Sequence, residues 1–154
     1  MMVMVLMGGN DVFSNGIYLN VIKAARDPAE EAWYNINAIN DVVRCIFTSK
    51  KITISAVRGN VAAGGAMMAL ASGFAFAREG SLLNPHYTKM KLYCSQYHAY
   101  FLLKRLGQEK VSELLNSAEP IMACEAADIG LLNTGSSITH RSLPTLLYRG
   151  ISSR

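Results

Sequence analysis

Residues 52–71 constrain the fold of this chain most strongly, because they join three kinds of segment without a linker. The short β-branched run I-T-I-S-A-V at 52–57 is typical of a strand, and the small apolar residues at 66–71 are typical of a helix. Between them lies G-N-V-A-A-G-G at 59–65. Without a Cβ, a glycine loop allows backbone N–H groups to approach a ligand closely. The segment predicts strand, loop and helix, and its spacing alone also fits a plain turn.

The rest of the chain alternates in the same way. A continuous apolar run at 2–6 predicts a central strand covered on both faces, and residues 74–77 and 82–83 predict further strands. Asp27 as N-cap, Pro28 at the first helical position and apolar residues at helical spacing predict a helix over 28–47. Helices are also expected at 95–106 and 108–117, separated by Gly107. Such alternation indicates an α/β fold with a mainly parallel sheet.

Composition narrows the function classes. A chain of 154 residues, about half of them hydrophobic, fits one domain with a substantial core. The formal net charge of +4 is spread along the sequence, which disfavours a nucleic-acid partner. Three cysteines in no CxxC pair indicate neither a disulfide framework nor a cysteine zinc site, and make the cytoplasm the default compartment. The apolar start is too short for a membrane anchor.

A second loop, F-S-N-G-I at 13–17, follows the first predicted strand and offers another inward-pointing amide. Two amides aimed at one point form an oxyanion hole, whose donors each lower a barrier by a few kcal/mol. Neither glycine loop matches the GxGxxG or GxxxxGK[ST] phosphate-binding patterns, so a nucleotide enzyme is disfavoured.

Three segments resemble motifs of one known family. F-S-N-G-I-Y-L at 13–19 resembles the loop A-F-x-A-G-x-D-[IL], and residues 59–65 resemble G-x-[AC]-x-G-G-G. A-C-E-A-A-D-I-G-L-L at 123–132 resembles the ending A-x-E-A-x-x-x-G-L-V. These are motifs of the crotonase (enoyl-CoA hydratase/isomerase) superfamily. The resemblance implies the ClpP/crotonase ββα-type spiral and an acyl-CoA thioester polarised by the Ile17 and Gly64 amides.

Longer strings resemble the crotonase-like domain of HypX/HoxX-type hydrogenase maturation proteins. They are F-S-N-G-I at 13–17, W-Y-N-I-N-A-I at 33–39, A-R-E-G at 77–80 and N-P-H-Y at 84–87. That branch is thought to take formyl-coenzyme A, delivered by a folate-linked domain, and to release carbon monoxide. The resemblance thus implies coenzyme A in the form of an acyl-CoA substrate, and no metal.

The resemblance covers residues 1–133 and suggests a fold truncated at both ends. Residues 134–154, rich in Ser and Arg, are expected to form a poorly ordered tail. The helix at 66–71 has no polar face and must be buried all round. We therefore expect a homo-oligomer or a missing domain to complete the fold.

The sequence departs from the family at the residues that move protons. Met67 and His86 stand where hydratases use two glutamates, and a thioether transfers no proton, so enoyl-CoA hydration is not expected. His86 is either titratable near neutrality or a loop cap. Cys94 and Gln96 stand where the HypX-like string has a glycine and an acidic residue. Of the two interpretations of Cys94, a buried thiol is preferred over a nucleophile.

Two groups of site residues follow from the motifs. The predicted catalytic residues are Ile17, Gly64, His86 and Tyr87, and the predicted substrate-binding residues are Asn15, Gly16, Gly65, Met67, Tyr93 and Gln96. The tyrosines of this region are alternatively core residues. Three functions remain open: an acyl-CoA enzyme of HypX-like type, a catalytically weakened scaffold that binds CoA thioesters or a partner chain, or an α/β domain with a purely structural role in an oligomer.

Overall fold

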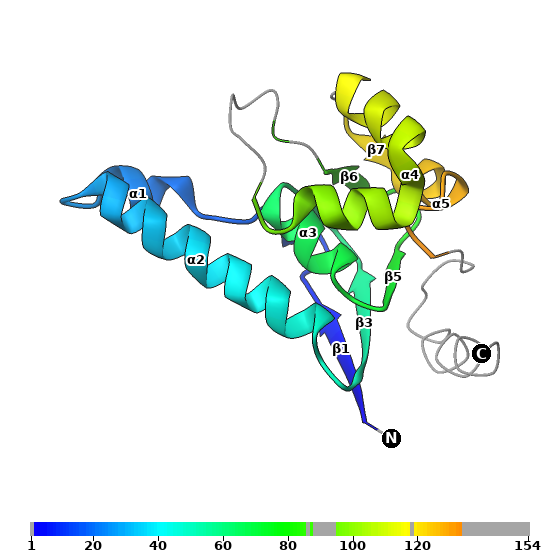
Figure 1. The fold of residues 1–154 in the computed structure, drawn as a ribbon, viewed down its shortest axis with the longest axis horizontal. Coiled ribbons are helices and arrows are strands. Elements are labelled where there is room, and N and C mark those ends of the chain that lie inside the picture. The colour runs from blue at the N-terminus through cyan, green and yellow to red at the C-terminus, as the bar shows by residue number, and fades with distance from the viewer. Residues whose placement is uncertain (1, 86, 88–94, 118, 134–154) are drawn as a thin grey trace.

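The computed structural model of the chain describes residues 2–85, 87, 95–117 and 119–133 (Figure 1). Two sheets and five helices lie within these residues. The strands are β1 (Val3–Met7), β2 (Val12–Ser14), β3 (Ile52–Val57), β4 (Asn60–Ala62), β5 (Phe74–Ala77), β6 (Leu82–Asn84) and β7 (Ile121–Met122). The helices are α1 (Leu19–Ala24), α2 (Pro28–Phe47), α3 (Gly64–Leu70), α4 (His98–Ser117) and α5 (Ala123–Asp128).

Parallel pairing dominates both sheets. The first has the order β1-β3-β5, and its register places Val5 beside Ile54 and Ile54 beside Phe74. The second has the order β2-β4-β6-β7, in which only β7 runs antiparallel to its neighbour. The expected α/β fold with a mainly parallel sheet is confirmed.

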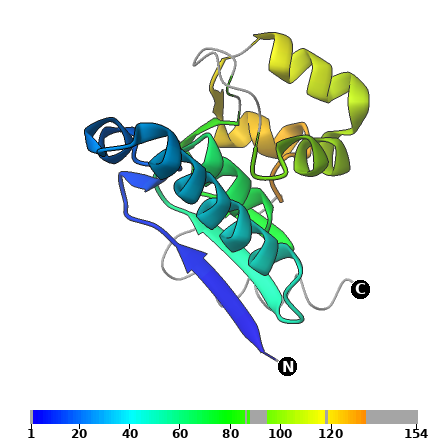
Figure 2. The same cartoon turned by 60° about the vertical axis from the view of Figure 1, so that its left-hand side comes forward.

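Helix α2 has the predicted bounds because its first turn is capped by side chain and proline together. The Asp27 carboxylate accepts the N–H groups of Ala29 at 3.0 Å and Glu30 at 3.1 Å, and Pro28 occupies the first helical turn. In Figure 2 the helix runs alongside β1 and β3. It buries Val43 and Ile46 towards the core.

Helix α3 is the buried centre of the fold. It contacts β3 and β5 of the first sheet, β2 and β4 of the second, and both α2 and α4. Its residues Ala66, Met67, Ala69 and Leu70 are at most 2% exposed. The chain itself therefore buries this apolar helix, which removes the apolar surface of α3 as a reason to expect a partner.

Two expectations about elements were wrong. Among the strands that the structure describes, β1 lies at the edge of its sheet instead of the centre, and its alternate residues Val3, Val5 and Met7 are exposed. A continuous apolar run does not distinguish a strand with one covered face from one with two. Residues 95–97 precede α4 instead of opening it, because Gln96 and Tyr97 have positive φ angles.

The expected interruption at Gly107 is confirmed by a φ of 74° within α4. The predicted tail at 134–154 lies outside the described residues.

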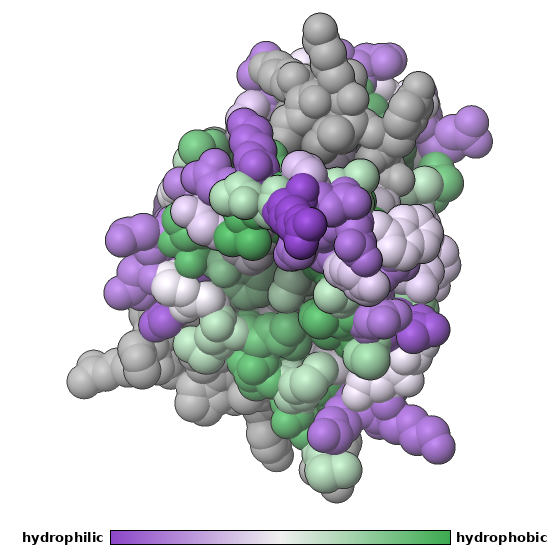
Figure 3. All heavy atoms as spheres, turned by 90° about the vertical axis from the view of Figure 1, so that its left-hand side faces the viewer, coloured by the Kyte–Doolittle hydropathy of each residue, from purple (hydrophilic) through white to green (hydrophobic). Residues whose placement is uncertain are grey.

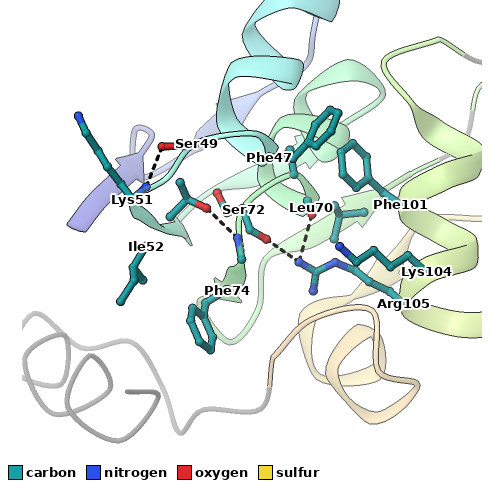
Figure 4. Close-up of a pocket in the computed structure, with 13 residues that line it drawn as sticks. Phe47, Ser49, Lys51, Ile52, Leu70, Ser72, Phe74, Phe101, Lys104 and Arg105 are labelled. Atoms are coloured by element: carbon teal, nitrogen blue, oxygen red, sulfur yellow. Dashed lines mark hydrogen bonds between the residues drawn. The ribbon is translucent and has the colours of Figure 1, made fainter. Parts of the chain in front are cut away.

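Arg105 of α4 fixes the C-terminal end of α3. Its guanidinium donates to the carbonyl oxygens of Leu70 at 3.1 Å, Ser72 at 2.9 Å and Leu131 at 3.2 Å, as Figure 4 shows for the first two. Burial lowers the pKa of Arg105, yet arginine stays charged in proteins. One cation thus satisfies carbonyl groups at the end of α3 and after α5, and so holds the helix whose other end is the glycine loop.

Replacing Arg105 by Met keeps the aliphatic bulk and removes all three hydrogen bonds. We expect Arg105→Met to lower the free energy of unfolding by about 2–4 kcal/mol, because buried carbonyls lose a charged donor. Arg44→Met is the matched control: Arg44 pairs with Asp41 on the surface, and such a pair contributes at most about 1 kcal/mol. Urea unfolding of the two variants measures the difference, and equal losses would contradict the role of Arg105.

Candidate functional site

The two loops singled out by the sequence meet in the structure. A Cβ built on Gly16 would lie 3.0 Å from the Gly64 nitrogen and 3.4 Å from the Gly65 nitrogen. Gly16 has a φ of 82°, a conformation that favours glycine, and its N–H donates to the Ser14 hydroxyl at 3.1 Å. The loop after β2 and the start of α3 therefore touch through their backbones.

Gly65 makes the closest approach between the loops. A Cβ at this position would lie 2.1 Å from the carbonyl oxygen of Ser14, a separation that no side chain tolerates. Two residues earlier, Ala63 holds a φ of 48°, and its N–H donates to the Asn84 carbonyl at 2.9 Å. Strained backbone of this kind is concentrated at functional sites. The close approach of the two backbones explains why glycine stands at positions 16 and 65.

A cavity of about 240 Å³ opens beside this contact, and we call it the glycine-loop cavity. It is lined by Asn15, Ile17, Leu19, Ile22, Ala32, Ile36, Ala63, Gly64, Tyr87, Ser95 and Gln96. Helices α1 and α2 supply its apolar wall, and the two loops supply its backbone. Figure 3, which looks from the side of α1, shows apolar surface through the middle of that face with polar surface on its flanks.

The polar wall of the cavity is a buried tyrosine–glutamine pair. The Tyr87 hydroxyl and the Gln96 Oε1 atom are 2.6 Å apart; because Oε1 only accepts, Tyr87 is the donor. Tyr87 is 6% and Gln96 2% exposed. A Cβ on Gly64 would lie 3.4 Å from Gln96 Oε1, which places the carboxamide directly against the glycine loop.

The structure brings together most of the predicted site residues that it describes. Asn15, Ile17, Gly64, Tyr87 and Gln96 line the glycine-loop cavity, and Gly16 and Gly65 form the loop contact beside it. Met67 is fully buried in the hydrophobic core and is not part of the cavity lining. His86 and Tyr93, together with Cys94, lie outside the described residues.

Sequence reasoning missed the contribution of α2. Ala32 and Ile36 line the cavity, Ile39 approaches Gly64, and the Asn40 side chain accepts the Gln96 N–H at 2.9 Å. The signal was present, since positions 32, 36, 39 and 40 share one face of a helix. The helical spacing was used only to predict the helix over 28–47.

A larger cavity of about 470 Å³ lies at the other end of α3 (Figure 4). Its lining includes the cations Lys51, Lys104 and Arg105. Arg105 is engaged by three carbonyl groups, Lys104 lies 5.4 Å from the ring centre of Tyr100, and Figure 4 shows Lys51 pointing away from both. None of the sequence motifs contributes a loop to it. The glycine-loop cavity is therefore the better candidate site.

Within the described part of the chain, no group of three or more His, Cys, Asp or Glu residues is placed to hold a metal ion. None of the helices in those same ranges is long and apolar enough to cross a membrane.

Comparison with known proteins identifies the same family that the loop motifs resemble. Residues 1–137 match the family model described as enoyl-CoA hydratase/isomerase. The chain belongs to the enoyl-CoA hydratase/isomerase family. It is 38% identical over 146 residues to the hydrogenase maturation factor HoxX of Bradyrhizobium diazoefficiens, and 29% identical over 132 residues to YhaR of Bacillus subtilis. These alignments cover 92% and 86% of the chain, which spans about a quarter (26%) of HoxX and half (51%) of YhaR.

Solved structures place the chain in the crotonase fold. A crystal structure of HypX from Aquifex aeolicus matches 97% of the chain with a TM-score of 0.87 and 42% identity, over 27% of the HypX chain. Another HypX structure of similar likeness, with a TM-score of 0.86, contains tetrahydrofolic acid. The enoyl-CoA hydratase of Bacillus halodurans matches with a TM-score of 0.85 at 21% identity, a likeness that concerns the fold alone. The crotonase-like fold and the relation to HypX/HoxX are thereby confirmed.

Proposed function

We propose that this chain binds an acyl-CoA thioester in the glycine-loop cavity, with the thioester carbonyl between the backbone N–H groups of Ile17 and Gly64. The observation that carries the proposal is the meeting of the two motif loops at one end of this cavity. Two amides at such a point stabilise the negative charge that develops on a carbonyl oxygen. The apolar wall from α1 and α2 suits the acyl and thioester part of the ligand.

Relation to HoxX and HypX favours formyl-CoA as the thioester. In this reaction the bond between the formyl carbon and sulfur breaks, carbon monoxide leaves, and the formyl hydrogen ends as the proton of the coenzyme A thiol. Tyr87 and Ser95 are the described lining residues that carry a hydroxyl, and the Tyr87 hydroxyl is held beside the glycine loop by its hydrogen bond to Gln96. A cavity of about 240 Å³ suits a small acyl group.

A catalytically weakened thioester-binding scaffold is the second candidate. It is favoured by Gln96, which places a neutral carboxamide against Gly64 where the HypX-like string has an acid. A carboxamide donates and accepts hydrogen bonds but does not take up a proton near neutral pH. Both candidate functions include binding of the thioester, and only the enzyme turns it over.

Turnover of two thioesters distinguishes the candidates. With formyl-CoA we expect loss of the thioester with matching release of carbon monoxide and free coenzyme A. With crotonyl-CoA we expect no hydration near the roughly 10 per second typical of enzymes, since Met67 is an apolar core residue. Absorbance follows the formyl and the crotonyl thioester, and gas analysis measures the carbon monoxide released from formyl-CoA. Binding without loss of formyl-CoA would favour the scaffold, and rapid crotonyl-CoA hydration would contradict the assignment.

Adding a methyl group to the glycine loop tests the oxyanion assignment. In Gly64→Ala the new Cβ would lie 2.8 Å from the Ile39 terminal methyl and 3.4 Å from Gln96 Oε1, so the loop or these side chains must shift. We expect acetyl-CoA to bind about tenfold more weakly, about 1.4 kcal/mol, and free coenzyme A to bind as before. Titration calorimetry measures both affinities.

Gly73→Ala is the matched control for this variant. Gly73 lies beyond the opposite end of α3, and a Cβ there makes an ordinary contact 3.5 Å from the Thr53 carbonyl oxygen. We expect the control to leave both affinities unchanged. Equal weakening of acetyl-CoA and free coenzyme A by Gly64→Ala would argue against a carbonyl-binding role.

We also propose that the chain self-associates through the edge of β1. Among the described residues this strand pairs with β3 alone, and its alternate residues Val3, Val5 and Met7 are 39–45% exposed. An exposed apolar edge strand is a template for pairing with a second chain. A second copy of the same edge would cover both strands.

Sedimentation of the purified chain at micromolar concentration measures this association. We expect a dimer or larger species, and a shift towards monomer in Val5→Lys, because a charge at the edge opposes pairing. Val42→Lys, at a position of α2 that is 45% exposed, is the matched control and should leave the distribution unchanged. A folded monomer of the unaltered chain would show the proposal to be wrong.

A further inference from the structure

A strained turn holds the polar wall of the glycine-loop cavity. Gln96 and Tyr97, two consecutive residues other than glycine, have φ angles of 51° and 58°. Each such residue costs on the order of 1–3 kcal/mol and persists only where its surroundings enforce it. Gln96 is at the same time almost fully buried against Gly64. Its backbone conformation therefore has to be imposed by contacts outside the turn.

Helix α2 supplies those contacts. The Oδ1 atom of Asn40 accepts the Gln96 backbone N–H at 2.9 Å, over a separation of 56 residues. Seven residues further on, about two helical turns, the Phe47 ring packs edge-on against the Tyr97 ring with centroids 5.1 Å apart. Asn40 also follows Ile39, whose terminal methyl lies beside Gly64. The helix that forms the apolar wall thus also braces the turn.

We infer that Asn40 is a positioning residue of the thioester site. By accepting the Gln96 N–H, it keeps the turn in its left-handed conformation and keeps the Gln96 carboxamide between Tyr87 and the glycine loop. Tyr87 donates to Gln96 Oε1, so the amide Nε2 group remains the donor end of the side chain. The inference rests on the proposed function, because it assigns Asn40 its effect through the thioester carbonyl region.

A merely structural role for Asn40 makes a different prediction. If the hydrogen bond only stabilised the fold, its loss would lower stability and weaken every ligand alike. A positioning role changes the preference for a thioester over free coenzyme A, since only the thioester has a carbonyl beside Gly64 and Gln96. The ratio of the two affinities is therefore the decisive quantity.

Three variants of the full chain test the inference. Asn40→Leu removes the acceptor, and Asn40→Asp keeps an oxygen in its place. Asn37→Leu, an exposed asparagine of α2 whose amide bonds only to the Trp33 carbonyl among the interactions described, is the matched control. Titrations with acetyl-CoA and coenzyme A give the affinity ratio, and hydrogen exchange of the Gln96 amide reports the bond itself.

We expect Asn40→Leu to lower the ratio about tenfold and to speed exchange at Gln96, with Asn40→Asp close to the unaltered chain and Asn37→Leu identical to it. An unchanged ratio in Asn40→Leu, or a loss in Asn40→Asp as large as in Asn40→Leu, would overturn the inference. If Asn40→Leu does not fold, Asn40→Ser, whose shorter side chain lacks the carboxamide and keeps a polar hydroxyl, is read by the same criteria.

Failure of the proposed function gives a distinct result. In that case the unaltered chain shows no preference for acetyl-CoA over coenzyme A. The role of Asn40 at a thioester is then overturned together with the proposed function, and the exchange measurement tests only the bracing of the turn: faster exchange of the Gln96 amide in Asn40→Leu and not in Asn37→Leu supports the bracing, and equal exchange in all variants overturns it.

Discussion

The backbone contact between the loop after β2 and the start of α3 is the constraint on which the rest of this structure depends. Gly65 lies so close to the Ser14 carbonyl that any side chain would separate the two segments, and a Cβ on Gly16 would lie 3.0 Å from the Gly64 nitrogen. With the loops in contact, two strands of the second sheet and the buried helix are fixed relative to each other. The cavity beside them is a consequence of this packing.

The contact requires α3 to stay in place, and two features ensure that it does. The helix is surrounded by strands of both sheets and by α2 and α4, so its apolar residues lose contacts with any displacement. Arg105 ties its C-terminal end to carbonyl groups of distant segments. A helix of seven residues has little stability of its own, and tertiary packing supplies the rest.

The sequence predicted the fold class, the bounds of α2 and the two loops, because capping, periodicity and glycine spacing are local signals. It misplaced β1 at the centre of its sheet, since an apolar run does not reveal how many strands flank it. It also extended α4 into residues 95–97, because nothing in Ser95, Gln96 and Tyr97 signals positive φ angles. The motifs predicted which loops would meet beside the cavity. The wall from α2 and the Asn40 contact arise from long-range packing, which no local pattern encodes.

Helix α2 carries both the apolar wall of the cavity and the oxygen that holds the Gln96 turn. A small rigid-body displacement of this one helix would change the width available to an acyl group and the aim of the polar wall in the same movement. Under the proposed function, selection of the acyl group by size and polarisation of the carbonyl would then be mechanically linked, so that a ligand too large for the cavity would also disturb the geometry needed to polarise it.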